Sequence, residues 1–194
     1  MYDVPVLFVL YTTHLFGIIA NHSVNHQLFA DVTQLQRSAP LSEVTNLTKE
    51  LNACTDDIKT WMTENQLKPN GDKTEVLLFP FSSSLKPSTV SLPDSITLGS
   101  HNIPFSDFAR NLGFILDSKL SMKKYVIKIC QSAYFELKHI SSVHRFLTED
   151  AAKTLVTSSI LSRFDYCNCL LMGTPNSVIQ PLQKIQYFAA RLVL

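Results

Sequence analysis

The chain has 194 residues, of which 45% are hydrophobic and 17% are charged, and its formal net charge at pH 7 is +1. That length can bury one domain, or a small domain with a packed appendage, and the near-zero charge argues against a partner that requires a strongly basic or acidic protein. The small net charge hides an asymmetry along the chain. Acidic residues outnumber basic ones in residues 1–97, and basic residues outnumber acidic ones in residues 98–194. A basic half can neutralise phosphates, and an acidic half can supply carboxylates that bind metal ions. Ordinary solvated helix faces have the same composition.

The cysteines and the N-terminal apolar run bear on the cellular compartment. The cysteines form neither a Cys-x-x-Cys pair nor a His-Cys zinc pattern, which favours free thiols in a reducing environment. Residues 4–20 are apolar enough to imitate a signal peptide, but they follow Asp3, lack a basic leading segment and are interrupted by polar residues. The run is also too polar to span a bilayer. We therefore expect an intracellular protein, cytoplasmic or nuclear, with no membrane partner.

The first part of the chain mixes helical and strand patterns. In chain order we predict a largely buried helix over 5–20, a hairpin with strands over 27–30 and 33–35, a helix over 41–66, a strand over 74–79, a Ser/Pro-rich loop over 80–93, two paired strands over 96–98 and 103–105, and a strand over 108–116. Asp31 falls near the tip of the first hairpin. Trp61 falls on the apolar stripe of the helix 41–66, so we expect it in the core.

After Asp117 the apolar period becomes helical and stays so. Three stripes mark three helices, over residues 122–137, 152–160 and 179–192, and the breaker Gly173-Thr174-Pro175 precedes the last. The sequence therefore predicts an α+β fold, with a mixed region over 1–117 and an all-helical region over 118–194.

Seven short stretches occur in an order and spacing typical of one family. They are residues 28–35 (LFADVTQL), 61–65, 67–75 (LKPNGDKTE), 112–117 (LGFILD), 120–122, 163–168 (RFDYCN) and 189–192. This series resembles the reverse transcriptases of non-LTR, LINE-type retrotransposons and covers nearly the whole chain. The resemblance implies a right-hand polymerase fold, in which residues 1–117 are a partial palm, a small antiparallel sheet with helices, and residues 118–194 are a helical thumb.

The resemblance also bears on catalysis. Such polymerases use two Mg²⁺ ions, which require several carboxylate oxygens. The family has two adjacent aspartates on the hairpin; here Asp31 corresponds to the first, and Val32, which has no ligand oxygen, replaces the second. A third carboxylate lies on an upstream strand of the family that has no counterpart before Pro5. We expect Asp31 to be at most an incomplete metal ligand, or simply a turn residue, and we expect no Mg²⁺ to be bound productively.

Two further positions have counterparts in the family. Lys73 matches a lysine that lies near the triphosphate and acts as a possible general acid, although a solvated lysine before a strand is an equal alternative. Leu112 and Gly113, with the hairpin around them, match the primer grip, where the protein backbone approaches the primer. A glycine in a strand is equally consistent with a simple bulge.

Basic residues cluster where the helical region begins. They are Lys119, Lys123, Lys124 and Lys128, which Arg163 and Arg191 are predicted to join. Lys124 and Lys128 share a helix face, and in a polymerase thumb such a row would lie along the phosphates of the template–primer duplex. A solvated helix face is the competing interpretation. Tyr166 either joins this surface or packs between helices.

Two functional hypotheses follow. The first is a piece of a retrotransposon reverse transcriptase, with an RNA template and a DNA primer as partners, that is inactive because of Val32 and the absent upstream palm. The missing N-terminal part of the polymerase is a possible further partner. The alternative is a non-catalytic nucleic-acid-binding module that uses the basic thumb helices.

Overall fold

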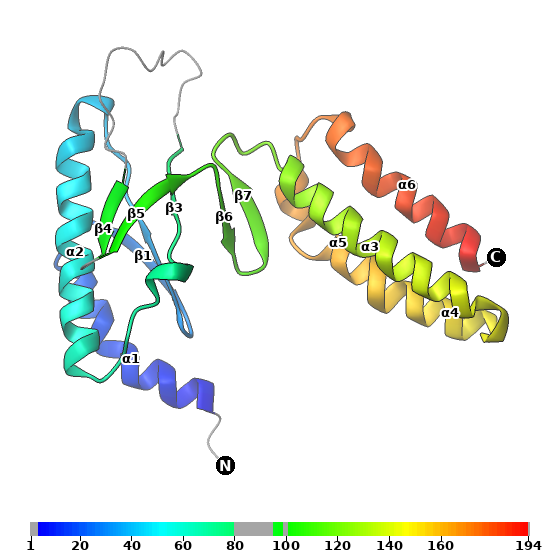
Figure 1. The fold of residues 1–194 in the computed structure, drawn as a ribbon, viewed down its shortest axis with the longest axis horizontal. Coiled ribbons are helices and arrows are strands. Elements are labelled where there is room, and N and C mark those ends of the chain that lie inside the picture. Colours follow the sequence, from blue (N-terminus) through cyan, green and yellow to red (C-terminus); the bar gives the residue numbers. More distant parts are fainter. Residues whose placement is uncertain (1–3, 80–94, 99–100, 194) are drawn as a thin grey trace. The chain divides into compact units, whose positions relative to one another are not determined.

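The computed structural model describes residues 4–79, 95–98 and 101–193. The chain divides into two compact units, Met1–Ser106, here called the N-terminal unit, and Asp107–Leu194, here called the helical unit. Figure 1 shows the elements of both units. The fold class is α+β, as the sequence predicts.

The N-terminal unit combines two long helices with short strands. Its elements are α1 (Val4–Ala20), β1 (Asn25–Phe29), β2 (Val32–Gln36), the 3₁₀ turn Leu41–Glu43, α2 (Val44–Glu64), the 3₁₀ turn Gly71–Lys73, β3 (Val76–Leu77), β4 (Ser95–Leu98) and β5 (His101–Ser106). Strands β1 and β2 form an antiparallel hairpin in which Phe29 pairs with Val32, so only Ala30 and Asp31 form the tip. Ala30 has a φ of 51°, and such a left-handed residue lets two strands reverse within two residues.

The core of this unit lies between α1 and α2. Its fully buried members are Leu15, Ile19, Val24, Cys54, Ile58 and Trp61. Trp61 is therefore a core residue, as predicted. The prediction that helix 5–20 is largely buried is wrong, because Val6 and Leu10 of α1 are 55% and 66% exposed. Only one stripe of α1 packs on α2, and the residues that the structure describes leave the opposite stripe uncovered.

The second sheet of the unit has the order β3-β5-β4, with β3 parallel and β4 antiparallel to β5. It is attached to α2, because the Thr97 amide donates to Asn52 Oδ1 at 3.1 Å and the Thr55 hydroxyl donates to the Thr97 carbonyl at 3.1 Å. The hairpin predicted from strands 96–98 and 103–105 is confirmed. Strand 74–79 is shorter than predicted, since Thr74 bonds back to Gly71 and belongs to the preceding turn. The predicted loop 80–93 lies outside the described residues.

The helical unit begins with a hairpin. Its elements are β6 (Phe108–Asn111), β7 (Phe114–Asp117), α3 (Lys123–Val143), the 3₁₀ turn His144–Phe146, α4 (Glu149–Val156), a π-helical segment Thr157–Leu161, α5 (Ser162–Asp165), the 3₁₀ turn Asn168–Leu171 and α6 (Asn176–Val193). The single strand predicted over 108–116 from the apolar pattern is wrong, whereas a hairpin around Leu112 and Gly113, which the resemblance implies, is present. Leu112 and Gly113 both have positive φ, 47° and 87°, so the chain reverses there and β6 pairs with β7.

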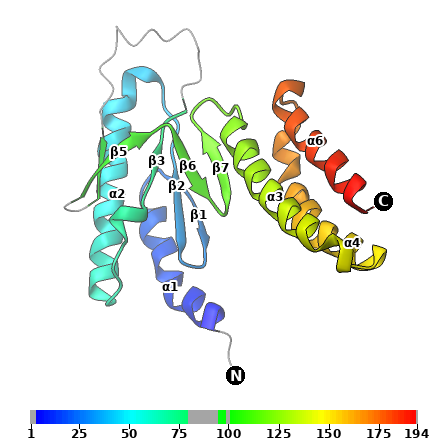
Figure 2. The same ribbon diagram turned by 45° about the vertical axis from the view of Figure 1, so that its right-hand side comes forward.

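The three predicted helices are present, and the second is continued through the π-helical segment to Asp165. Helices α3 and α6 run side by side, as Figures 1 and 2 show. Ala133, Ile160 and Ile185 are completely buried between the helices. Phe114 of β7 belongs to the same core and stacks on Tyr125 with ring centroids 3.8 Å apart. The hairpin therefore belongs with the helices, and the units divide after Ser106 rather than after the predicted residue 117.

Candidate nucleic-acid interface

In the N-terminal unit, Asp31 lies at the tip of the β1–β2 hairpin and Val32 follows it. Both are exposed, and Val32 pairs with Phe29 as the first residue of β2. Among the described residues, no group of three or more His, Cys, Asp or Glu side chains is placed to hold a metal ion. Asp31 thus occupies the turn position that was predicted for it, and its possible role as a metal ligand stays a prediction.

Lys73 is the last residue of the 3₁₀ turn that leads to β3. Its backbone amide donates to Asn70 Oδ1 at 3.2 Å, while its side chain is exposed. Asn70 caps the turn. A Cβ at Gly71 would come within 2.9 Å of His101 Cγ, so a larger residue here would force the exposed His101 ring to move. The turn is therefore explained by its packing, and the proposed general acid role of Lys73 stays a prediction.

The tip of the β6–β7 hairpin is tied to the end of α5. The Tyr166 hydroxyl donates to the carbonyl of Leu112, and the Tyr125 hydroxyl donates to the carbonyl of Tyr166 at 2.8 Å. Burial, followed by the proximity of Cys167 and Tyr166, raises the pKa of Tyr125 to about 12. Tyr125 therefore stays a neutral donor at physiological pH. Tyr166, half exposed, holds the hairpin tip rather than packing between helices.

The connection from β7 to α3 is organised by one carboxylate. Asp117 is 8% exposed; its Oδ1 accepts from the amides of Lys119 and Ser121 at 3.1 and 3.0 Å, and its Oδ2 accepts from the Met122 amide at 2.9 Å. The Ser121 hydroxyl also donates to Oδ2, at 3.1 Å. Burial alone would raise the pKa of Asp117, but these hydrogen bonds outweigh it and hold the pKa below its usual value. Leu120 and Met122 both have positive φ, 51° and 60°, so the carboxylate stabilises a backbone path that non-glycine residues rarely adopt.

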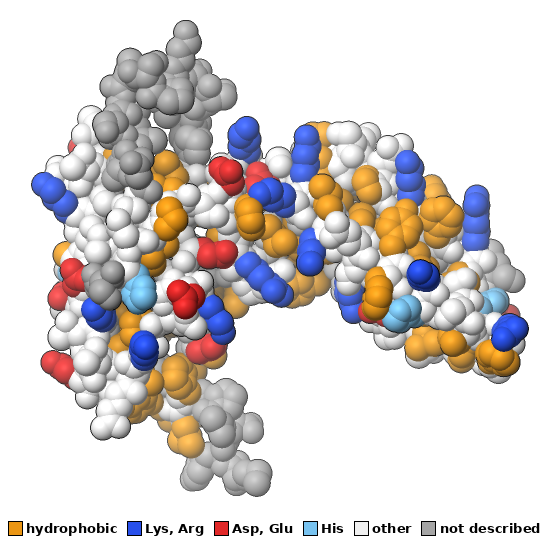
Figure 3. All heavy atoms as spheres, viewed as in Figure 1, with side chains coloured by type: hydrophobic (Ala, Val, Ile, Leu, Met, Phe, Trp, Pro, Cys, Tyr) orange, Lys and Arg blue, Asp and Glu red, His pale blue; other side chains and the backbone are white. Residues whose placement is uncertain are grey.

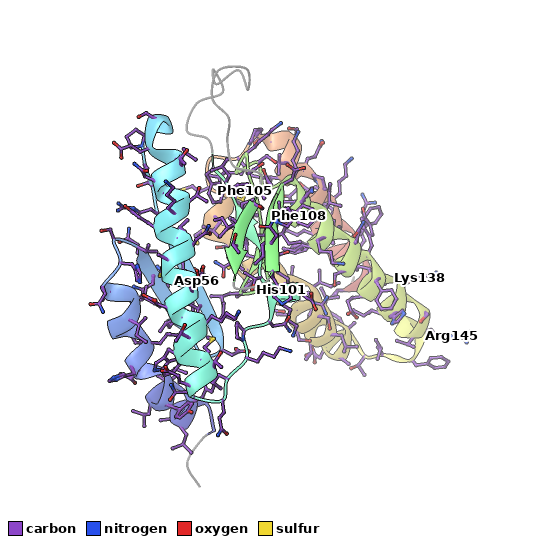
Figure 4. All side chains as sticks on the ribbon, turned by 60° about the vertical axis from the view of Figure 1, so that its left-hand side comes forward. Asp56, His101, Phe105, Phe108, Lys138 and Arg145 are labelled. Carbon is purple, nitrogen blue, oxygen red and sulfur yellow. The ribbon has the colours of Figure 1, made fainter. Side chains whose placement is uncertain are left out.

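The lysine row begins within this connection, at Lys119, and continues into α3. Lys119, Lys123, Lys124 and Lys128 are all exposed. Lys124 extends over the ring of Phe108 with its Nζ 3.5 Å from the ring centroid, which is a cation–π contact between α3 and the base of the hairpin. Figure 4 labels Phe108 on β6. The row thus starts beside the base of the same hairpin whose tip carries Leu112 and Gly113.

The two predicted arginines have different surroundings. Arg163 of α5 donates to Ser132 and pairs with Glu136 Oε1 at 3.1 Å, so its charge is already matched by α3. Arg191 lies exposed in the last turn of α6. The helical unit therefore holds all the predicted nucleic-acid-binding residues, whereas Asp31 and Lys73 belong to the N-terminal unit.

Comparison of the chain with protein-family models, with curated proteins and with solved structures finds no match in any of the three. None of the helices in the described ranges combines the length and apolar character needed to cross a membrane.

Sequence reasoning missed two residues that shape this interface. Asp117 marks only a boundary in the sequence pattern, although Asp side chains commonly bind backbone amides in turns. Tyr125 falls inside the helix predicted over 122–137, and nothing in the sequence indicates a polar role for it. Its hydroxyl contacts residue Tyr166, which is distant in the sequence, so no local pattern could have indicated that bond.

Proposed function

We propose that the chain is a piece of a protein derived from a non-LTR reverse transcriptase, and that its helical unit holds an RNA–DNA duplex without performing polymerase chemistry. The observation that carries the proposal is the lysine row of α3 beside a hairpin with an exposed backbone tip. Lys124 and Lys128 are one helical turn apart and exposed, a spacing suited to successive phosphates of one strand.

The hairpin and the lysine row have a fixed relation to each other. Asp117 holds the turn between them, Phe114 packs on Tyr125, and Tyr166 holds the tip. Leu112 and Gly113 are exposed residues at the hairpin tip, and of their backbone groups the Leu112 carbonyl is already bound by Tyr166. A rigid pair of surfaces of this kind loses little conformational entropy on binding.

The cation–π contact of Lys124 does not prevent phosphate binding. An exposed contact of this type contributes about 0.5–1 kcal/mol. A phosphate that displaces it gains a charge-assisted hydrogen bond and releases counterions. We therefore expect the lysine to exchange the Phe108 ring for a phosphate.

The affinity is tested by fluorescence anisotropy of the whole chain with a labelled RNA–DNA hybrid over a range of salt concentrations. Lys124→Gln with Lys128→Gln should weaken binding and reduce the slope of log K against log salt by about 2, because each phosphate contact contributes roughly 0.9. Lys49→Gln with Lys68→Gln removes the same charge from the N-terminal unit and is the matched control. Equal losses in both variants would overturn the proposal.

The expected lack of polymerase chemistry rests on Val32, which stands where the resembling family has its second aspartate, and on the family's third carboxylate, which has no counterpart in this sequence. Primer extension on a poly(rA) template with Mg²⁺ or Mn²⁺ tests it, with the unaltered chain and Val32→Asp compared. We expect no incorporation by either, because one restored carboxylate does not complete a two-metal site. Template-dependent incorporation by the unaltered chain would contradict the proposal.

A further inference from the structure

Helices α3 and α6 together carry a second exposed surface that the duplex proposal does not use. Tyr134 of α3 and Phe188 of α6 are 46% and 51% exposed, and their ring centroids lie 6.4 Å apart. Neither ring belongs to the core of the helical unit. The two rings form an aromatic platform that bridges the two helices, here called the α3–α6 platform.

The platform is bordered by basic side chains. Lys138 lies one helical turn after Tyr134, and Lys184 and Arg191 lie one turn before and after Phe188, so each shares a face with its ring. All three are exposed. Figure 3 shows Lys and Arg side chains interspersed with hydrophobic ones over these helices, and Figure 4 shows Lys138 on α3.

Within α3 and α6, no unpaired acidic side chain opposes this charge. Helix α6 contains no Asp or Glu in its sequence, and the one acidic residue of α3, Glu136, is paired with Arg163. A second copy of the chain is a poor occupant, since two identical basic borders would repel each other. The charge pattern favours a polyanion, and the exposed rings favour a polyanion with planar apolar groups.

We propose that the α3–α6 platform binds single-stranded nucleic acid, with bases stacked on Tyr134 and Phe188 and phosphates on Lys138, Lys184 and Arg191. Single strands are the appropriate class because the bases of a duplex are already stacked on each other and are not free to cover a side-chain ring. The platform goes beyond the proposed duplex contact, which Lys124 and Lys128 carry, and it assigns to the single strand Arg191, which the sequence predicted to join the duplex row.

The test uses the whole chain and a labelled oligothymidylate of about 12 nucleotides, a length within the range that compact single-strand sites cover. Tyr134→Leu with Phe188→Leu keeps both side chains apolar but removes the rings, and it should lower the affinity about 10-fold or more. Tyr134→Phe keeps the ring and should bind like the unaltered chain. Phe135→Ala is the matched control, because Phe135 is an exposed ring on α3 that packs on His139 instead.

The phosphate contacts are tested separately. Lys184→Gln with Arg191→Gln should reduce the salt slope by about 1.4, because each contact to a single strand contributes roughly 0.7. Unlabelled polyglutamate should compete poorly, since it supplies charge without planar bases. Unchanged affinity of the double leucine variant, an equal loss in Phe135→Ala, or full competition by polyglutamate would each overturn the proposal.

The two proposals can fail independently. Lys124→Gln with Lys128→Gln should weaken the hybrid and leave oligothymidylate binding within about 2-fold, as expected for separate and additive sites. The double leucine variant should show the reverse pattern. Parallel losses on both ligands would contradict the assignment of single strands to the α3–α6 platform.

Discussion

The substitution Asp117→Ala probes the connection between the β6–β7 hairpin and α3. It removes the acceptor of three backbone amides and one hydroxyl, all within 3.1 Å of the carboxylate. The amides of Lys119 and Ser121 can regain water, since Lys119 is exposed and Ser121 is half-buried, but the Met122 amide bond is buried. An unsatisfied buried donor costs about 1–3 kcal/mol, and the released turn also leaves two left-handed residues that cost about 1–3 kcal/mol each without compensation.

These contributions are not additive, and we expect Asp117→Ala to lower the free energy of unfolding of the helical unit by about 3 kcal/mol. Asp117→Asn keeps one acceptor oxygen for Lys119 and Ser121 but places an amide group opposite the Met122 N–H. Its cost should be smaller, about 2 kcal/mol.

Hydrogen exchange of the α3 amides, followed by mass spectrometry, measures this loss in the helical unit. Trp61 provides the control, since it is the only tryptophan and lies in the core of the N-terminal unit, where its fluorescence should not change. A loss below about 1 kcal/mol for Asp117→Ala would refute the idea that the carboxylate organises the turn.

The stability that Asp117 contributes depends on pH in a definite direction. Because the pKa of Asp117 is lowered in the folded chain, its stabilisation is complete above the ordinary Asp pKa of about 4 and is lost as the pH falls below that value. The difference in unfolding free energy between the unaltered chain and Asp117→Asn should therefore stay constant down to about pH 5 and shrink as the pH falls below about 4. A difference that grows over this interval would contradict the assigned direction of the shift.

Three other substitutions test the hairpin and the core. Leu112→Asn should stabilise the helical unit by about 1 kcal/mol, since Asn tolerates the positive φ of Leu112 and Asn-Gly favours this type of turn. Calorimetry should show a higher melting temperature, and a lower one would contradict the turn geometry. Tyr166→Phe removes the donor to the Leu112 carbonyl and should speed hydrogen exchange in the hairpin by about 10-fold, with α6 unaffected; equal exchange rates would mean that the bond does not form in solution. Ile185→Ala should cost about 2–4 kcal/mol in denaturant unfolding, because Ile185 is fully buried between the helices, whereas Gln186→Ala on the exposed side of α6 should cost little.

The sequence predicts the elements well where the apolar period is long. Helices α2, α3 and α6 follow stripes of many residues, and the burial of Trp61 follows from its place on one of them. The first hairpin was also predicted, since its two strands flank an Asp in a turn position. Each of these signals is local to the segment that it describes.

The errors occur where a distant contact decides the structure. The apolar pattern predicts one strand in place of the β6–β7 hairpin because leucine rarely adopts positive φ and so gives no turn signal at Leu112. The hydrogen bond from Tyr166 to the Leu112 carbonyl holds the backbone in that conformation. The burial of α1 was overestimated because the apolar content of a helix does not indicate how much of it a neighbour covers. Arg163 looked available in sequence, and only its folded position beside Glu136 shows its pairing.

The parallel pairing of β3 with β5 has a consequence for the order of folding. The pairing joins two residues of each strand, Val76–Leu77 and Phe105–Ser106, and closes a loop of about 30 residues. Only the few hydrogen bonds of this short ladder offset the conformational entropy lost on closing the loop. The hairpin and helices of Asp107–Leu194 begin instead with contacts between near neighbours, which form quickly. On a growing or refolding chain, the last structure to assemble should thus be the sheet edge of the N-terminal unit, although most of that unit emerges first.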